Sequence, residues 1–359
     1  MLLVDDIDKL FISSAVTISN ALKQLDVTGK QILLVIDNKE DLLGIVTDGD
    51  FRRAILDSVD LSNPVSSIIN RNYRWVFEES DRDEIVNEFL TNRIDHLLIL
   101  DKNHHIKNIV MRGNLKYKDE SLIKKPDNWI VIMAGGKGNR LHPFTKILPK
   151  PMIPLGDKPI IEVIMDRFNS FGFCKFLISV NYKKEIIKLY FQEINNLGYT
   201  VEFIEEEQPM GTIGSLSLSN DKFKDTVLVT NCDVIIEINY NQLLEFHHKS
   251  KNDITIVGSL RHFKIPYGVI HSNQKEFEKI DEKPEYEIMI NTGLYCLEPG
   301  IIKLIPRDSH FDMTDLINKA KNIGKKIGIY PVYNSYFDVG QWEEYRKTLV
   351  HFDISEEME

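Results

Sequence analysis

The chain has 359 residues, enough for two or three domains, and 43% hydrophobic with 27% charged residues is ordinary for a globular protein. A formal net charge of -10 disfavours nonspecific binding to nucleic acid or to an anionic membrane, so we expect neither as a partner. The apolar runs are far shorter than the roughly 20 residues of a membrane span, and the acidic start MLLVDDIDKL does not resemble a signal peptide. Cys174, Cys232 and Cys296 form no CxxC motif, and we expect reduced thiols in a cytoplasmic protein.

The first third of the chain contains two similar segments. Residues 17–56 predict a helix, the strand ILLVID, a turn, the strand LLGIVT and the helix DFRRAIL. Residues 83–115 predict a second copy, with a helix, the strand HLLILD, the turn KNHH and the strand IKNIVM. In the first helix, one face is apolar and is expected in the core: Ile18, Leu22 and Leu25.

The first copy, with GIVTDGDFRRAI in it, resembles the CBS domain (cystathionine-β-synthase type), which works in pairs. We therefore expect tandem CBS domains at about 1–62 and 63–118. The resemblance implies that Thr47 and Asp50 hold an adenine or guanine nucleotide as an effector, and that the pair stacks into a homo-oligomer. The alternative is that both residues only cap the next helix. The second copy has Met111 and Asn114 at these positions, which makes a second ligand site doubtful.

The segment after the repeats is charged, and residues 119–128 are interpreted as a linker before a domain at 129–351. From there strand-like and helix-like segments alternate: NWIVIMA, KPIIEVIMDRFNSFG, KFLISVN, KEIIKLYFQEI and TVEFIEE. GTIGSLSLS is a candidate short helix, and DTVLVTNCD is expected to be a buried strand that ends in an acid. This alternation predicts an α/β domain with a doubly wound, mostly parallel sheet that binds its ligands at the carboxyl ends of the strands.

The loop that follows the first of these strands is rich in glycine, basic and stiffened by proline. It lacks the GxxxxGK[ST] spacing of a P-loop, and Leu141 stands where a dinucleotide fingerprint needs a small residue. Arg140 offers a fork to phosphate oxygens, and Lys150 is set between two prolines that stiffen its backbone. Three glycines allow backbone N–H groups to line an anion: Gly135, Gly136 and Gly138. On spacing alone, a tight turn with solvated basic side chains is the alternative.

The loop sequence MAGGKGNRLHPFTKILPKPMIPLGDKPIIE closely resembles the signature of the sugar-1-phosphate nucleotidyltransferases. Later motifs follow in the order of that family: EEEQPMGTIGSL, VTNCDVII, PYGVI, IDEKP, INTGLYCLEP and YFDVGQWEEY. The resemblance implies an α/β fold with a Rossmann-like, doubly wound mixed sheet of the GT-A kind, preceded by the α+β CBS pair. It also implies transfer of a nucleotidyl group from a nucleoside triphosphate to a sugar 1-phosphate, with release of pyrophosphate. Because the attacking oxygen is already an anion, positioning and charge neutralisation suffice without a general base.

The resemblance also assigns roles to residues. Arg140 and Lys150 would be catalytic, through contacts with pyrophosphate and the reacting phosphates. Asp233 and Asp338 would bind Mg2+, a role that suits two carboxylates brought to one edge of a sheet, although each acid alone could be a helix cap. The residues implied in nucleotide binding are Ala134, Gly135, Gly136, Gly138, Glu206, Gly211 and Thr212. Those implied in binding the sugar phosphate are Gly268, Glu282, Lys283, Asn291 and Thr292.

The acids at 205–207 bear on the choice of base. A carboxylate can accept both the N1–H and the 2-amino group of guanine, whereas uracil and thymine would repel it, so Glu206 or a neighbour favours GTP. The alternative is a solvated strand end, with UTP or CTP as the substrate. The CBS pair ahead of this domain resembles the guanylyltransferases of bacterial legionaminic-acid pathways, which implies glucosamine 1-phosphate. Mannose 1-phosphate stays open, because sugar specificity depends on the loop between Ile265 and Asn291, and so does a non-enzymatic nucleotide sensor.

Overall fold

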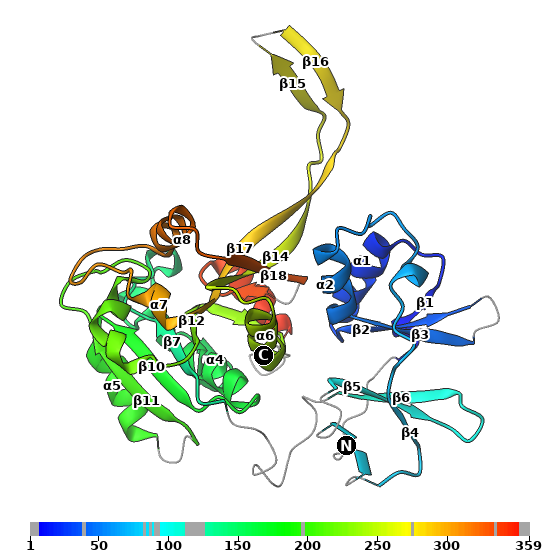
Figure 1. Cartoon of the computed structure of the whole chain (residues 1–359), viewed down its shortest axis with the longest axis horizontal. Coiled ribbons are helices and arrows are strands. Elements are labelled where there is room, and N and C mark those ends of the chain that lie inside the picture. Colours follow the sequence, from blue (N-terminus) through cyan, green and yellow to red (C-terminus); the bar gives the residue numbers. More distant parts are fainter. Residues whose placement is uncertain are drawn as a thin grey trace. The chain divides into compact units, whose positions relative to one another are not determined.

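A computed structural model of the chain describes residues 7–37, 41–81, 84–85, 88–89, 94–111, 126–194, 198–273, 276–333 and 336–351. The chain divides into two compact units, Met1–Lys124 and Lys125–Glu359 (Figure 1). Most of the predicted linker at 119–128, together with Asn114, lies outside the described residues. Within the described residues, no helix has the length and apolar character needed to cross a membrane.

The first unit contains two three-stranded sheets of the same topology. The first consists of β1 (Phe11–Ser13), β2 (Ile32–Ile36) and β3 (Leu42–Thr47); the second consists of β4 (Trp75–Phe77), β5 (His96–Leu100) and β6 (Ile106–Met111). In each sheet the first two strands are parallel and the last two antiparallel. The duplication predicted from the sequence is therefore confirmed at the level of topology.

The two repeats share apolar packing. Helix α1 (Ile18–Thr28) ends at Gly29, which has the left-handed φ of 60° that glycine tolerates, and α2 (Asp48–Leu56) follows β3. One buried cluster joins Leu34 of the first sheet to Leu98 of the second. The predicted core face of α1 is confirmed, because all three of its residues are buried: Ile18, Leu22 and Leu25.

The second unit is built on a seven-stranded mixed sheet, in the order β11-β10-β7-β12-β17-β14-β18. Its strands are β7 (Trp129–Met133), β10 (Lys175–Val180), β11 (Thr200–Glu205), β12 (Val227–Asn231), β14 (Ile254–Lys264), β17 (Glu285–Leu297) and β18 (Ile327–Tyr333). Only β17 runs antiparallel to its neighbours within this sheet. The predicted mixed α/β fold class is confirmed.

Helices cover both faces of this sheet, because alternate residues of the buried strands point to opposite sides. Ile130 and Ile132 belong to a core with α4 (Ile160–Asn169), α5 (Lys184–Glu193) and α6 (Tyr240–Lys249). Val131, between them, belongs to a core with α7 (Pro299–Ile302) and α8 (Met313–Asn322). The expected helix at GTIGSLSLS is a 3-10 helix at Gly214–Lys222, and α9 (Trp342–His351) follows the last strand.

Two strands continue beyond the sheet as a ribbon. β14 and β17 pair as far as Lys264 and Glu285, and β15 (Val269–Asn273) and β16 (Glu276–Asp281) then form a second antiparallel ribbon. Figure 1 shows this ribbon standing away from the sheet of its own unit. The expectation of a loop between Ile265 and Asn291 was therefore wrong for most of its length. These strands are short and carry charged residues at many positions, so they lack the apolar run that marks a buried strand.

Candidate active site

The glycine-rich loop begins at the carboxyl end of β7, as predicted. Ala134 N–H donates to the carbonyl of Ser179 at 2.9 Å, which continues the pairing of β7 with β10. Gly138 has a φ of 65°, and a Cβ atom there would lie 2.8 Å from Lys150 Cβ. Thr145 Oγ1 donates to the carbonyl of Gly138 at 3.0 Å. The loop therefore folds back onto Lys150, and glycine is required at the contact.

The outer part of the loop is held by side chains that the sequence analysis did not single out. Lys183 Nζ donates to the carbonyls of Lys146 at 2.5 Å and Ile147 at 2.7 Å. On the other side, Trp342 Nε1 donates to the carbonyl of His142 at 3.2 Å. Residues from β10–α5 and from α9 thus hold a loop that has little regular structure of its own.

The two predicted metal ligands are brought together by a small sheet. Asp233 directly precedes β13 (Val234–Ile236), and Asp338 is the last residue of β19 (Tyr336–Asp338). The two strands are antiparallel, with Val234 opposite Asp338. Val339 N–H donates to the Asp233 carbonyl at 2.9 Å. The sequence predicted the proximity of the acids but attributed it to the large sheet.

Lys150 joins the two acids at Gly340. Lys150 Nζ forms an ion pair with Asp233 Oδ2, and Gly340 N–H donates to Asp338 Oδ1 at 2.8 Å. A Cβ atom at Gly340 would lie 2.6 Å from Asp233 Oδ2, 2.8 Å from Asp338 Oδ1 and 2.8 Å from Lys150 Nζ. The three charged groups therefore surround one point, and only a residue without a side chain fits beside them. Gly340 lies two positions after Asp338 in the motif DVGQW. This glycine was the feature of the sequence that could have indicated the close approach of the three charged groups.

The electrostatics of this cluster favour a cation. Burial and, second, the negative charge of Asp233 raise the pKa of Asp338, while Lys150 and Arg140 act in the opposite direction. Arg140 lies exposed in the 3-10 helix Asn139–Leu141. Within the described residues, no three His, Cys, Asp or Glu side chains gather so that they could hold a metal ion. Two carboxylates are hard oxygen donors that fit Mg2+, provided that phosphate or water oxygens complete its octahedral shell.

The three acids at 205–207 have different surroundings. Glu205 is exposed and accepts from Lys184 and Lys188, which lower its pKa to about 2. Glu206 is only 5% exposed: it accepts from Ser179 Oγ at 2.6 Å and from Met210 N–H at 3.1 Å. A Cβ atom at Gly135 would lie 3.0 Å from Glu206 Oε1, so this carboxylate is next to the glycine loop. The solvated-end alternative therefore fits Glu205 but not Glu206.

Gly211 and Thr212 stabilise the start of α8. Thr212 Oγ1 donates to Asp312 Oδ1 at 3.1 Å and accepts from Met313 N–H at 2.8 Å. Gly211 has a φ of 79°, and a Cβ atom there would lie 2.6 Å from the carbonyl of Phe311. The hydroxyl of Thr212 is therefore engaged within the protein, and its role toward a nucleotide stays a prediction.

The residues expected to bind the sugar phosphate lie along the ribbon. Gly268, Glu282 and Lys283 are at the junction of its two parts, where a Cβ atom at Gly268 would lie 3.0 Å from Glu282 Oε2. Asn291 Nδ2 donates to Tyr295 Oη at 2.6 Å within β17. Thr292 is 1% exposed, and its hydroxyl donates to the carbonyl of Val257 at 2.8 Å. The Thr292 hydroxyl is therefore engaged with the backbone, and its role toward a sugar stays a prediction.

In the first unit, Thr47 and Asp50 form the helix cap that was the alternative to ligand binding. Thr47 N–H and Oγ1 donate to Asp50 Oδ2 at 2.8 and 2.7 Å, and Arg53 pairs with the other carboxylate oxygen. Both groups are satisfied within α2 and its cap. A nucleotide contact by this pair stays a prediction.

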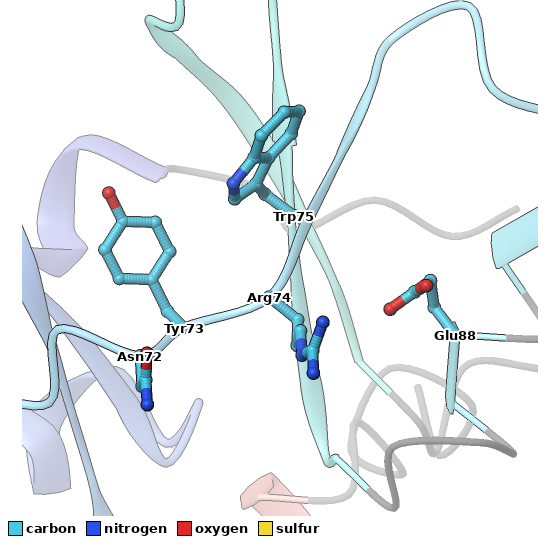
Figure 2. A pocket seen from close by; sticks show the side chains of 5 residues that line it. All are labelled: Asn72, Tyr73, Arg74, Trp75 and Glu88. Carbon is cyan, nitrogen blue, oxygen red and sulfur yellow. The ribbon is translucent and has the colours of Figure 1, made fainter.

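A cavity of about 430 Å³ opens elsewhere in the first unit. Its lining comes from the segment before β5 in the second repeat: Asn72, Tyr73, Arg74, Trp75 and Glu88. Figure 2 shows the rings of Tyr73 and Trp75 on one side of the extended segment and the side chains of Asn72 and Arg74 on the other. Sequence analysis missed this cavity, because no motif marks residues 72–75, which supply most of its lining.

Comparison with known proteins agrees with this division. Residues 130–353 match the nucleotidyl transferase family, and residues 4–57, the first of the two repeats, match the CBS domain. The structure is similar to that of HddC from Yersinia pseudotuberculosis, with a TM-score of 0.51, 26% sequence identity and coverage of 63% of this chain and 99% of that one. A second HddC structure, complexed with GMP-PN, has a TM-score of 0.50 and 25% identity.

Two relatives of known name are both called mannose-1-phosphate guanylyltransferases or guanyltransferases. The mannose-1-phosphate guanylyltransferase of Mycobacterium tuberculosis is 29% identical over 224 residues, which is 60% of this chain and 60% of that protein. The mannose-1-phosphate guanyltransferase of Debaryomyces hansenii is 36% identical over 228 residues, 60% of this chain and 62% of that protein. The chain thus spans about three fifths of the length of these relatives.

Proposed function

The chain belongs to the nucleotidyl transferase family, and we propose that it transfers a nucleotidyl group from a nucleoside triphosphate to a sugar 1-phosphate, releasing pyrophosphate. The observation that carries this proposal is the convergence of Lys150, Asp233 and Asp338 on Gly340, directly behind the glycine loop. Such a cluster suits a reaction between two polyanions, since cations must be held where the phosphates meet.

The protein groups act by positioning and by neutralising charge. Backbone N–H groups of the glycine loop would receive the triphosphate, and the Arg140 guanidinium would pair with the departing pyrophosphate. Lys150 would neutralise charge at the reacting phosphates from the floor of the site, where Asp233 holds its ammonium. Mg2+, bound by Asp233 and Asp338, would supply further neutralisation of the phosphate oxygens.

We propose guanine as the base. Glu206 is a buried carboxylate beside Gly135, and two of its hydrogen-bonding positions are used by Ser179 and Met210. A carboxylate offers about four such positions, so two would stay available for the N1–H and 2-amino groups of guanine. The names of the two relatives and the GMP-PN complex of HddC support the same base.

Two sugars are candidates. The domain arrangement, with a CBS segment ahead of the transferase domain, supports glucosamine 1-phosphate and a place in legionaminic-acid or surface-glycan synthesis. The relatives named mannose-1-phosphate guanylyltransferase support mannose 1-phosphate as the alternative. Glucosamine 1-phosphate carries an ammonium in place of the 2-hydroxyl, so acceptance of one sugar over the other is a sharp test.

The test measures pyrophosphate release by the full chain with Mg2+ and each pairing of GTP, ATP, UTP, CTP or dTTP with glucosamine, N-acetylglucosamine, mannose or glucose 1-phosphate. Turnover that requires GTP and one sugar supports both the proposed nucleotidyl transfer and the proposed choice of base and sugar. Glu206→Gln should reduce the preference for GTP over ATP, because an amide cannot accept both donors; the control is Glu207→Gln, which changes an exposed neighbour.

Asp233→Asn should lower turnover at least a hundredfold while the circular dichroism and the nucleotide affinity persist, since loss of one ligand of an essential cation removes charge stabilisation. Unchanged turnover in Asp233→Asn would contradict the assignment of the site. Binding of nucleotides without release of pyrophosphate in any pairing would instead favour a nucleotide sensor.

We also propose that the cavity of the first unit takes an adenine or guanine nucleotide as an effector. Its Tyr73 and Trp75 rings could stack on a base, and the Arg74 guanidinium could pair with phosphate. Quenching of Trp75 fluorescence by AMP, ATP or GTP, abolished in Trp75→Leu, is the expected result. Saturable quenching that persists in Arg74→Gln and Trp75→Leu would place the ligand elsewhere.

A further inference from the structure

The ribbon of residues 261–288, called the arm below, is exposed along most of its described length. β14 and β17 leave the sheet as a pair, and β15 with β16 extends them (Figure 1). Residues 274–275 between β15 and β16 lie outside the described part of the chain. Two isolated strands are at best marginally stable in water, so an arm of this kind gains stability when another surface packs on it.

The outer part of the arm is amphipathic. The register places Ile270 opposite Ile280 and Ser272 opposite Phe277, which puts these side chains on one face. The apolar members of this face are largely exposed: Ile270 is 65%, Phe277 69% and Ile280 52% accessible. On the other face, His271 Nε2 and Lys279 Nζ contact Asp281 at 2.8 and 2.9 Å. One face is thus satisfied by ion pairs, and the other is apolar and open.

The inner part repeats this pattern. Phe263 lies opposite Tyr286, and Ile288, two positions along the same strand, shares their face. Phe263 and Ile288 are each 48% exposed. Half of the six large apolar side chains in the two parts adds up to roughly 500 Å², an area near the upper end of the patches that monomeric proteins expose when it lies on one face. A contact in which two such arms cover each other would bury roughly 1,000 Å², about the lower limit of a specific interface.

The charge of the arm indicates its partner. Residues 261–288 contain five Lys or Arg and six Asp or Glu, so the arm is close to neutral within a chain of net charge -10. A near-neutral arm provides no basic stripe for nucleic acid or anionic lipid. Two copies of this acidic chain repel each other least where their near-neutral parts meet. Charges of both signs along the arm also suit a self-complementary contact about a twofold axis.

We infer that the apolar face of the arm is the contact between two copies of this chain, in which the arm of one protomer lies against the arm of its partner. Ile270, Phe277 and Ile280 of each copy would then meet their equivalents at the spacing of packed sheets, about 10 Å. The inference concerns assembly and does not depend on the proposed reaction.

The first experiment measures the mass of the full chain by sedimentation equilibrium over a range of micromolar concentrations. Phe277→Glu should raise the dissociation constant at least a hundredfold, because each substitution is present twice in a twofold contact and the two carboxylates repel. The matched control is Leu189→Glu on α5, which introduces the same charge at a side chain that is 55% exposed but away from the arm. Circular dichroism and the melting temperature report whether either variant is still folded.

A second measurement separates the arm contact from an assembly made by the first unit. Cys174→Ser leaves only buried thiols, and Ser272→Cys adds a spin label on the apolar face of the arm. Electron-spin distances between copies below about 30 Å are expected, given the 10 Å spacing of packed sheets and the length of two labels.

Three results would overturn the inference. The first is a wild-type chain that stays at its monomer mass of 41.6 kDa throughout. The second is an oligomer whose mass and label distances do not change in Phe277→Glu. The third is a Phe277→Glu variant that expands in small-angle scattering without any change in mass, because the arm would then be covered by its own chain.

Discussion

At the scale of single residues, the site depends on a position that carries no functional group. Gly340 has three charged groups around the point where a Cβ atom would lie, the nearest at 2.6 Å. Gly340→Ala therefore forces Lys150, Asp233 or Asp338 to move, and misplacement by about 1 Å can lower a rate about a hundredfold. We expect kcat/KM for pyrophosphate release to fall by about that factor, with little change in the melting temperature.

The control for this variant is Gly300→Ala in α7, because a Cβ atom there meets no heavy atom within 4 Å. Turnover of the control should stay within about twofold of the wild type, since an added methyl group in open space displaces nothing. Equal losses in both variants would show that the effect at Gly340 is one of general stability rather than of the charged cluster.

The sequence predicted part of this site. Asp233 and Asp338 could be paired in advance from the resemblance to the family, because they stand in its motifs VTNCDVII and YFDVGQWEEY. The difference in surroundings between buried Glu206 and exposed Glu205 could not be predicted. It depends on Ser179, which contacts Glu206, and on Ser215, which contacts Ser179, and both hydroxyls are isolated in segments far away in the sequence. The engagement of the Thr292 hydroxyl could not be predicted for the same reason: only the fold decides whether a hydroxyl faces solvent or a backbone carbonyl.

At the scale of elements, Lys183 connects the start of α5 to the outer half of the glycine loop. Lys183→Met keeps the length of the side chain but removes both hydrogen bonds, so the loop should sample positions in which Arg140 is misplaced. We expect a loss of about tenfold in kcat/KM, equal to about 1.4 kcal/mol, and faster cleavage of the loop by trypsin.

The adjacent Lys184 provides a matched control, because its ammonium contacts Glu205 instead of the loop. Lys184→Met should leave kcat/KM and the cleavage rate near those of the wild type. If both lysine variants behave alike, α5 rather than the loop anchor is responsible.

A second set of hydrogen bonds between elements, made by His247, makes the stability of the fold depend on pH. His247 of α6 is fully buried; its Nδ1 lies 2.7 Å from Thr255 Oγ1 of β14, and its Nε2 lies 3.0 Å from Glu298 Oε1. Burial lowers the pKa of His247 below its ordinary value of 6.5, although Glu298 acts in the opposite direction. The folded state therefore binds fewer protons than the unfolded state, and this contribution to stability declines as the pH falls through 6.5 toward the folded-state value.

We expect His247→Gln to flatten the decrease of melting temperature between about pH 7 and pH 5, because the titrating group is gone. The variant should also be less stable at pH 7.5, by about 1–3 kcal/mol, the usual effect of disturbing buried hydrogen bonds. A wild-type slope in His247→Gln would assign the acid sensitivity to other groups.

The arm shows why elements differ in how well a sequence predicts them. α1 and β7 were predicted because burial of one face or of a whole strand imposes an apolar period. β15 and β16 have no such constraint within one copy of the chain, since their apolar residues alternate with charges and face solvent. The charged residues between the apolar ones interrupt any continuous apolar run, so the segment was expected as a loop.

At the scale of the whole molecule, the two units have separate apolar cores. Phe89 is fully buried in the first unit, in a cluster with Val76, Leu97 and Val110, whereas Asp233 and Asp338 belong to the second unit. Phe89→Ala should destabilise the first unit by about 3–5 kcal/mol, the usual effect of removing a buried phenylalanine. Calorimetry should then show one transition at a lower temperature and a second, unchanged one that GTP with Mg2+ shifts upward.

Turnover of Phe89→Ala at 25 °C should stay within about twofold of the wild type as long as the first unit remains folded at that temperature. Phe168→Ala, the equivalent change in the core of the second unit, should lower the other transition and the turnover together, since Phe168 packs beneath the strands that carry the site. A single transition that moves as one in both variants would mean that the units unfold cooperatively. Ligand binding in the first unit would then stabilise the site in the second directly, and the effector proposed for the cavity would change activity through global stability.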